Sequence, residues 1–142
     1  MQVTLDTLPS FVSDFVRNFP KGKLGNAYVV GLKGDLGAGK TTFVQAVAKE
    51  LGVTERVTSP TFVVVKTYAI DTPPFKRLVH ADLYRMHSND TDTIGWSEYV
   101  KNGENIILAE WSDRVPGGIP LETPILSFSV VDEDTREIVW MK

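Results

Sequence analysis

The residues best suited to chemistry form one short run in the first third of the chain. They are Gly34, Asp35, Leu36, Gly37, Ala38, Gly39, Lys40, Thr41 and Thr42. The run fits the pattern G-x-x-x-x-G-K-[ST], which is typical of a phosphate-binding loop. Its glycines leave no Cβ in the way and permit positive φ, so consecutive backbone N–H groups can turn toward one anion. The run, called the phosphate loop below, therefore predicts a site for the phosphates of a nucleotide.

The last three residues of the phosphate loop have separate expected roles. Lys40 can reach the β- and γ-phosphates, and the hydroxyl of Thr41 can bind Mg²⁺. Thr42 is expected to help hold the α-phosphate. A helix that begins near Lys40 would add the partial positive charge of its N-terminus. These residue types predict a magnesium–nucleotide complex as the ligand.

A strand and a helix are needed to position such a loop, and the flanking sequence predicts both. Residues 27–32 are an apolar run of the buried-strand type. Beyond the loop, Gly52 is expected to end a helix. The apolar residues on one face of that helix are Phe43, Val44, Val47, Ala48 and Leu51. Strand, loop and helix in this order are the context that the motif requires.

Magnesium at a phosphate loop needs a second protein ligand, usually an acid at the end of a neighbouring apolar strand. Two acids meet this description. Asp82 follows the apolar run 78–81, and Glu110 follows the apolar run 106–109. The residue types alone leave open which of the two would bind the metal.

Several other residues could have roles at or near the same site. Thr61, within Ser59–Phe62, could bind Mg²⁺ or the γ-phosphate and order that segment only with a triphosphate. His80 and His87 stand in different contexts and do not predict a zinc pair, and Trp111 is expected to serve packing. Transition-state charge could come from an arginine, the candidates being Arg56, Arg85 and Arg114.

The rest of the chain predicts a mixed sheet. Strands at 61–70 and 77–82 are joined by the short turn 71–75, which favours an antiparallel hairpin because a parallel crossover needs a dozen or more residues. A second hairpin is expected from strands 125–131 and 136–141. Further expected elements are a short strand at 2–5, a helix with apolar positions from Leu8 to Phe19 capped by Thr7, a short helix near 92–100, a strand at 105–111 and a loop at 112–124.

Bulk properties narrow the class of protein. The length of 142 residues predicts one domain, residues 1–142. The chain has no cysteine and no apolar run long enough to cross a bilayer, so a cytoplasmic location is expected. A net charge of −3, from 15 basic and 18 acidic residues, argues against a dedicated nucleic-acid surface. RNA contact through a partner remains compatible with this charge.

With these residues in view, the chain resembles the TsaE (YjeE) family, small bacterial P-loop ATPases required for the threonylcarbamoyl modification of tRNA adenosine. The resemblance extends from about Leu5 to Arg136. The matching segments are the phosphate loop, Ser59-Pro60-Thr61-Phe62, His80-Ala81-Asp82-Leu83-Tyr84-Arg85 and Glu110-Trp111. Their combination and order are far more specific than any one motif.

The resemblance implies an α/β fold, a three-layer P-loop NTPase-like arrangement whose mixed sheet has a parallel core and flanking antiparallel strands. It implies that Lys40 and Thr41 bind phosphate and Mg²⁺, and that Thr61 belongs to a switch-like segment. By the same resemblance Asp82 is important for hydrolysis and Glu110 is the acidic magnesium ligand. The implied cofactors are ATP and Mg²⁺. The implied partners are TsaD, which carries the transferase chemistry, and TsaB, with tRNA reached indirectly through the complex and no role for a membrane.

Three alternatives use the same loop. A small-molecule kinase would need an acceptor pocket and usually a helical lid, whereas the C-terminal half of this chain is expected to form strands. A GTP switch would normally carry the guanine-reading motif Asn-Lys-x-Asp, which is absent. A nucleotide-binding module without turnover would have little use for both Asp82 and Glu110.

Overall fold

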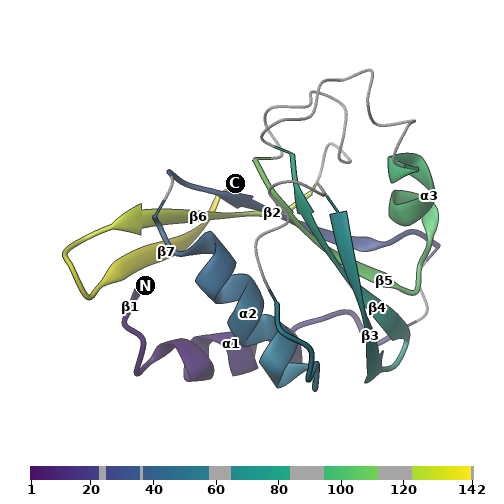
Figure 1. Ribbon diagram of the computed structural model, residues 1–142, viewed down its shortest axis with the longest axis horizontal. Coiled ribbons are helices and arrows are strands. Elements are labelled where there is room, and N and C mark those ends of the chain that lie inside the picture. Colours follow the sequence, from purple (N-terminus) through teal and green to yellow (C-terminus); the bar gives the residue numbers. More distant parts are fainter. Residues whose placement is uncertain (23–24, 36, 58–64, 84–94, 112–122, 142) are drawn as a thin grey trace.

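The computed structural model describes residues 1–22, 25–35, 37–57, 65–83, 95–111 and 123–141. Helices lie on both faces of one central sheet (Figure 1). The elements of the described chain are β1 (Gln2–Val3), α1 (Leu8–Arg17), β2 (Tyr28–Lys33), α2 (Lys40–Glu50), β3 (Val65–Thr72), β4 (Phe75–Asp82), α3 (Trp96–Lys101), β5 (Asn105–Glu110), β6 (Ile125–Val130) and β7 (Arg136–Met141).

The sheet has seven strands in the order β1-β7-β6-β2-β5-β4-β3. Strands β6, β2, β5 and β4 run parallel in its centre, and β3, β7 and β1 pair antiparallel at its sides. This arrangement confirms the predicted parallel core with antiparallel flanks. The first hairpin is tighter than expected, because Thr72 pairs directly with Phe75 and leaves only residues 73–74 between the strands.

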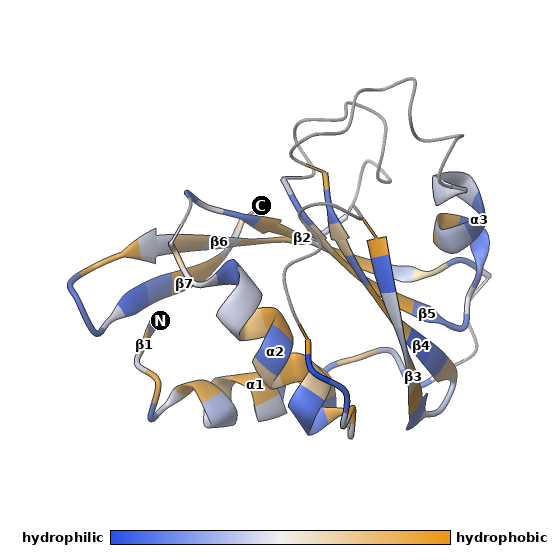
Figure 2. Cartoon of the chain, in the orientation of Figure 1, coloured by the Kyte–Doolittle hydropathy of each residue, from blue (hydrophilic) through white to orange (hydrophobic). Residues whose placement is uncertain are grey.

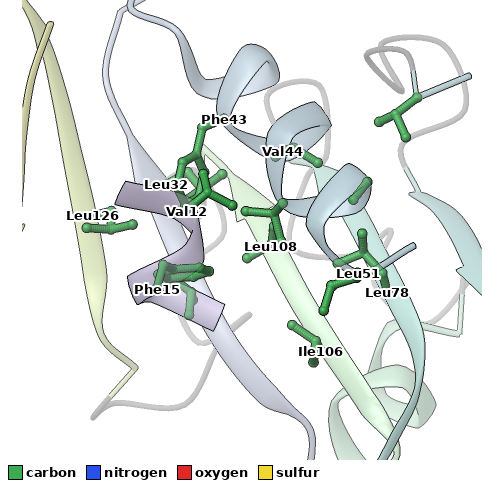
Figure 3. Packing of buried hydrophobic residues seen from close by; sticks show 14 of the residues in the cluster. Val12, Phe15, Leu32, Phe43, Val44, Leu51, Leu78, Ile106, Leu108 and Leu126 are labelled. Atoms are coloured by element: carbon green, nitrogen blue, oxygen red, sulfur yellow. The ribbon is translucent and has the colours of Figure 1, made fainter. Parts of the chain in front are cut away.

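The larger of two apolar clusters lies between the sheet and the helices α1 and α2 (Figure 3). Leu32, Leu108 and Leu78 come from adjacent parallel strands and point to the same face, where Phe43 of α2 and Phe15 of α1 cover them. The Phe15 and Phe43 rings meet edge to face, with centroids 5.1 Å apart. Burial of each such side chain contributes about 1.5–3 kcal/mol, so this cluster fixes α2 and the loop before it against the sheet.

The opposite face of the sheet carries a smaller cluster. Val29, Val79 and Ile107 alternate with the residues of the first cluster and pack around Trp96 of α3. Apolar residues dominate the central strands, whereas polar residues mark the rim (Figure 2). Because both faces of the central strands are buried, these strands read in the sequence as continuous apolar runs.

Two predictions about the N-terminal region need correction. Thr7 stands at the helix N-cap position, but its side chain makes no capping hydrogen bond. Its Oγ1 instead accepts a hydrogen bond from the backbone N–H of Thr4, at 2.9 Å, because the chain turns back on itself between β1 and α1. The short strand expected at residues 2–5 covers only residues 2–3, where it pairs with β7.

The other elements agree with their predictions to within a few residues. Helix α2 begins at Lys40 and ends at Glu50, close to Gly52. The strand expected at 61–70 appears as β3, and the helix expected near 92–100 appears as α3. In the part of the chain that the structure describes, no helix is both long and apolar enough to span a membrane.

Candidate active site

Three parallel strands end side by side at one edge of the sheet. Leu32 of β2 pairs with Glu110 of β5, and Glu110 pairs in turn with Asp82 of β4. Neighbouring strands lie about 4.8 Å apart, so the two predicted acids are immediate neighbours. The phosphate loop leaves the same edge directly after Lys33. The structure therefore brings both acids and the loop together at the carboxyl end of the sheet, where open α/β sheets bind ligands.

The glycines of the loop serve two different needs. Gly37 and Gly39 have φ angles of 80° and 101°, which side-chain-bearing residues rarely adopt. At Gly34 the need is space, because a Cβ there would lie 2.6 Å from the carbonyl oxygen of Phe128 on β6. The expected glycine geometry is thus confirmed, and the loop is seated tightly against the neighbouring strand.

Lys40 is buried at the centre of the loop. Its ammonium donates a hydrogen bond to the Gly34 carbonyl and lies 3.7 Å from the centroid of the Trp111 ring, a cation–π arrangement. Trp111 has a φ of 58°, and its backbone N–H donates to the Leu32 carbonyl at 3.3 Å. Trp111 does pack, as expected, but it packs against the lysine of the site.

Glu110 has a partner that sequence reasoning missed. The Nε2 atom of His80 lies 2.5 Å from the Oε2 atom of Glu110, and the two side chains are 0% and 5% exposed. His80 belongs to β4 and stands two residues before Asp82, so all three side chains share one face of the sheet. Because side chains alternate along a strand, the sequence could have predicted that His80 and Asp82 share one face of β4. The contact of His80 with Glu110 depends on the pairing of β4 with β5, which the sequence does not reveal.

An arginine contacts the phosphate loop from the far end of the chain. Arg136 of β7 donates from Nη1 to the carbonyls of Asp132 and Thr135, at 2.9 and 3.2 Å, and from Nη2 to the Gly37 carbonyl at 3.4 Å. The arginines expected from the sequence as sources of transition-state charge are different ones. Of these, Arg56 is exposed, and residues 85 and 114 lie outside the described chain. No motif marks Arg136, because its link to the loop depends on the β6–β7 hairpin.

A cavity of about 590 Å³ opens beside the loop. Gly39 and Thr42 line one side, residues 4–6 another, and residues 133–134 with Arg136 a third. Apolar side chains from α2 and the adjacent strands form its floor. The cavity therefore adjoins the end of the loop at which Thr42 was expected to hold an α-phosphate.

The oxygen donors at the sheet edge fit Mg²⁺ by type, because this ion takes hard oxygen ligands. Within the described ranges, no group of three or more histidine, cysteine or acidic side chains could hold a metal ion. Mg²⁺ is usually bound by one or two carboxylates together with substrate phosphates and water. The pair of Asp82 and Glu110, with the Thr41 hydroxyl in the first turn of α2, suits such a shared site.

Some predicted residues receive less support. Leu36 and Thr61 lie outside the described chain, as do residues 84–85 of the matching segment. Asp35 is exposed, and its backbone carbonyl accepts a hydrogen bond from the Ala38 N–H at 3.1 Å, which closes the first turn of the loop.

The fold and the site together define a P-loop protein of the ATPase type: a glycine loop between a central parallel strand and a helix, a buried lysine, and acids at neighbouring strand ends. A comparison with protein families narrows this class. The family described as "Threonylcarbamoyl adenosine biosynthesis protein TsaE" matches residues 6–138, and the chain belongs to the TsaE family.

Individual relatives agree with the family match. The chain is 39% identical over 112 residues to the tRNA threonylcarbamoyladenosine biosynthesis protein TsaE of Bacillus subtilis, covering 79% of this chain and 68% of the relative. The protein of the same name from Aquifex aeolicus is 42% identical over 118 residues, covering 81% and 77%. Among solved structures, the crystal structure of Bacillus subtilis YdiB superposes with a TM-score of 0.73 at 28% identity, covering 99% of this chain and 82% of that one. The predicted resemblance and fold class are confirmed, and none of these matches favours a kinase.

Proposed function

We propose that this chain is a Mg²⁺-dependent ATPase that serves the biosynthesis of N6-threonylcarbamoyladenosine in tRNA, acting with TsaD and TsaB. The observation that carries the proposal is the convergence of Lys40, Asp82 and Glu110 at one edge of the sheet in a member of the TsaE family. The proposal treats residues 1–142 as one catalytic unit in the cytoplasm. The names of the relatives supply the pathway.

The phosphate loop would hold the triphosphate through its backbone N–H groups and Lys40. In the structure the Lys40 ammonium donates to the Gly34 carbonyl. A phosphate oxygen is a charged and therefore stronger acceptor than a carbonyl. Lys40 would exchange the carbonyl for the β- and γ-phosphates, while the N-terminus of α2 would add its partial charge.

Thr41 and Glu110 would hold the metal, and Asp82 would act on the attacking water or on the Thr61 segment. When bound there, Mg²⁺ would supply positive charge against the negative charge that develops on the transferred group. Glu110 is the better ligand of the two acids because it lies directly beside β2, the strand that leads into the loop, whereas Asp82 lies one strand further away.

The cavity beside Thr42 would receive the nucleoside. Its apolar floor suits a base, and the carboxylates of Asp6, Glu133 and Asp134 at its rim are hydrogen-bond acceptors for the amino group of adenine. Arg136 would lie between the loop and this base, held by backbone carbonyls on both sides. We therefore assign the adenine, for which the sequence motifs gave no site, to this cavity.

Turnover by the isolated chain would be slow. Arg136 contacts the loop at Gly37 and lines the nucleoside cavity, so in the described chain no arginine is assigned to the γ-phosphate. An arginine supplied by a partner can accelerate phosphoryl transfer by ~10³ or more. With a net charge of −3, the chain is also poorly suited to dock tRNA by itself.

The test is ATP hydrolysis by the purified chain, measured alone and with TsaB and TsaD, together with a tRNA gel shift. We expect slow hydrolysis alone, a clear gain with both partners, and weak, salt-sensitive tRNA binding. Rapid hydrolysis that the partners leave unchanged would contradict the proposal, and so would tight, salt-resistant tRNA binding by this chain alone.

A further inference from the structure

We propose that His80 is a positioning residue, which holds one oxygen of Glu110 so that the other faces the metal. The inference rests on the proposed function, in which Glu110 binds Mg²⁺. Its basis is a buried side-chain contact to which the motifs assign no role, namely the 2.5 Å approach of His80 Nε2 to Glu110 Oε2.

The sheet itself creates this contact. His80 pairs in register with Leu108, so Glu110, two residues further along β5, lies diagonally across from it on the same face. Side chains in this diagonal relation are within reach of one another. The pair lies on the sheet face that carries Leu78 and Leu108 of the larger apolar cluster, and both of its side chains are buried. The histidine therefore contacts Glu110 from the buried side of the site and not from the side of the phosphate loop.

The direction of the hydrogen bond follows from the two groups. A carboxylate only accepts, so the Nε2 atom of His80 carries the hydrogen. Within the described chain, the other ring nitrogen of His80, Nδ1, has no hydrogen-bond partner. Among the described residues, the hydrogen bond to Glu110 is thus the only one that this fully buried ring makes.

The two oxygens of Glu110 have different surroundings. Oε2 receives the histidine, and no hydrogen bond to Oε1 is found within the described part of the chain. Asp82 lies beside Glu110 in register, and two adjacent carboxylates repel one another. In the proposed arrangement, a donor on the buried side keeps the Glu110 side chain in one orientation and leaves Oε1 for the metal.

Stability alone is a poor reason for such a pair. Replacing a buried polar pair by well-packed apolar residues is often neutral or stabilising. A ligand that must present one oxygen in a fixed direction does need a second group to orient it, and loss of such an orienting group typically costs 10–100-fold in metal affinity.

The test measures ADP affinity by calorimetry in Mg²⁺ and in EDTA. In Mg²⁺, ADP should bind to His80→Leu ~10-fold or more weakly than to the wild type. In EDTA, the two proteins should bind ADP with equal affinity. His80→Gln, whose side-chain N–H can replace Nε2, should retain most of the affinity gained with Mg²⁺. Val79→Ala is the matched control, because Val79 is equally buried on the same strand but faces away from Glu110. An unchanged gain in His80→Leu would overturn the inference.

Two further measurements separate this inference from the proposed function. If Glu110→Ala leaves the Mg²⁺ dependence intact, the metal assignment fails; if Glu110→Ala abolishes it and His80→Leu does not, only the role of His80 fails. The double variant should be no worse than Glu110→Ala. If His80→Leu does not fold, nitrogen-15 NMR of His80 in the wild-type chain can test the inference instead. The Nε2–H bond should persist when Mg²⁺ and ADP are added, and its loss would overturn the inference.

Discussion

The candidate site has two sides that differ in construction. The first is the side proposed to bind the metal, called the metal side below. Its residues His80, Asp82 and Glu110 come from two neighbouring parallel strands, at or near the edge of the sheet. The second is the side proposed to receive the nucleoside, called the nucleoside side below. Its cavity is lined by residues 4–6, the phosphate loop and the β6–β7 hairpin. Side chains contact one another on the first side, whereas on the second Arg136 is held by backbone carbonyls.

This difference has a physical consequence. A buried pair in a low-dielectric sheet interior depends strongly on the identity of each side chain. Contacts to backbone carbonyls at an open cavity depend on the path of the chain and tolerate substitution better. We therefore expect substitutions on the metal side to have larger effects than those on the nucleoside side.

The largest effect should separate the two acids of the metal side. Asp82→Ala should bind MgATP almost as well as the wild type but lose turnover by ~10²–10⁴, the usual contribution of a group that acts on the attacking nucleophile. Glu110→Ala should instead weaken magnesium-dependent binding. Calorimetry and partner-stimulated hydrolysis measure the two quantities, and equal loss of binding in both variants would contradict the division of roles.

The next effect concerns the loop between the two sides. Lys40→Ala removes the ammonium expected at the β- and γ-phosphates, and a hydrogen bond to a charged group is worth about 1.5–3 kcal/mol. MgATP should therefore bind roughly a hundredfold more weakly at the upper end of that range. Lys49→Ala, at the exposed end of α2, is the control. Equal affinities of Lys40→Ala and wild type in calorimetry would refute the assignment.

A smaller effect tests how the loop is seated on the hairpin. Gly34→Ala places a Cβ 2.6 Å from the Phe128 carbonyl oxygen, so the loop or β6 must shift. We expect a loss of about 1–3 kcal/mol in the free energy of unfolding, the usual cost of overpacking. Gly22→Ala meets no atom within 4 Å and should stay close to wild type. Urea unfolding compares the two, and equal stabilities would show that the contact yields easily.

The smallest effect is expected for Asp132, in the turn between β6 and β7. The hydrogen bond from the Asp134 N–H, at 2.9 Å, is the main cause that lowers the pKa of Asp132 below its ordinary value of 3.8. A lowered pKa in the folded state means that the ionised carboxylate stabilises the fold above pH 3.8, and that this contribution is lost as the pH falls through the lower value.

Asp132 is fully exposed, so this contribution should be slight. Asp132→Asn keeps an acceptor for the Asp134 N–H but does not titrate. Thermal unfolding between about pH 2 and 5 should show a slightly weaker pH dependence in the variant than in the wild type. Identical pH dependences would argue against the hydrogen bond in solution.

Those parts of the site that depend on neighbours along the chain could be predicted from the sequence. A strand, a glycine loop and a helix are adjacent in sequence, so their order and spacing predict the position of Lys40 at a helix start. Acids that directly follow apolar runs predict strand ends, and Asp82 and Glu110 do lie at strand ends. The same local reasoning was wrong about the capping bond of Thr7, because a competing hydrogen bond with Thr4 satisfies the side chain.

Contacts between residues far apart in the chain could not be predicted in this way, because they depend on how the strands pair. His80 and Glu110 are 30 residues apart, and their contact depends on the register of β4 with β5. Arg136 and Gly37 are 99 residues apart, and they meet because β6 pairs with β2 and β7, which carries Arg136, pairs with β6. Composition and periodicity report which face of an element is buried, but not which strand lies beside it. Strand order and register therefore placed the partner of Glu110 and the cavity beside Thr42.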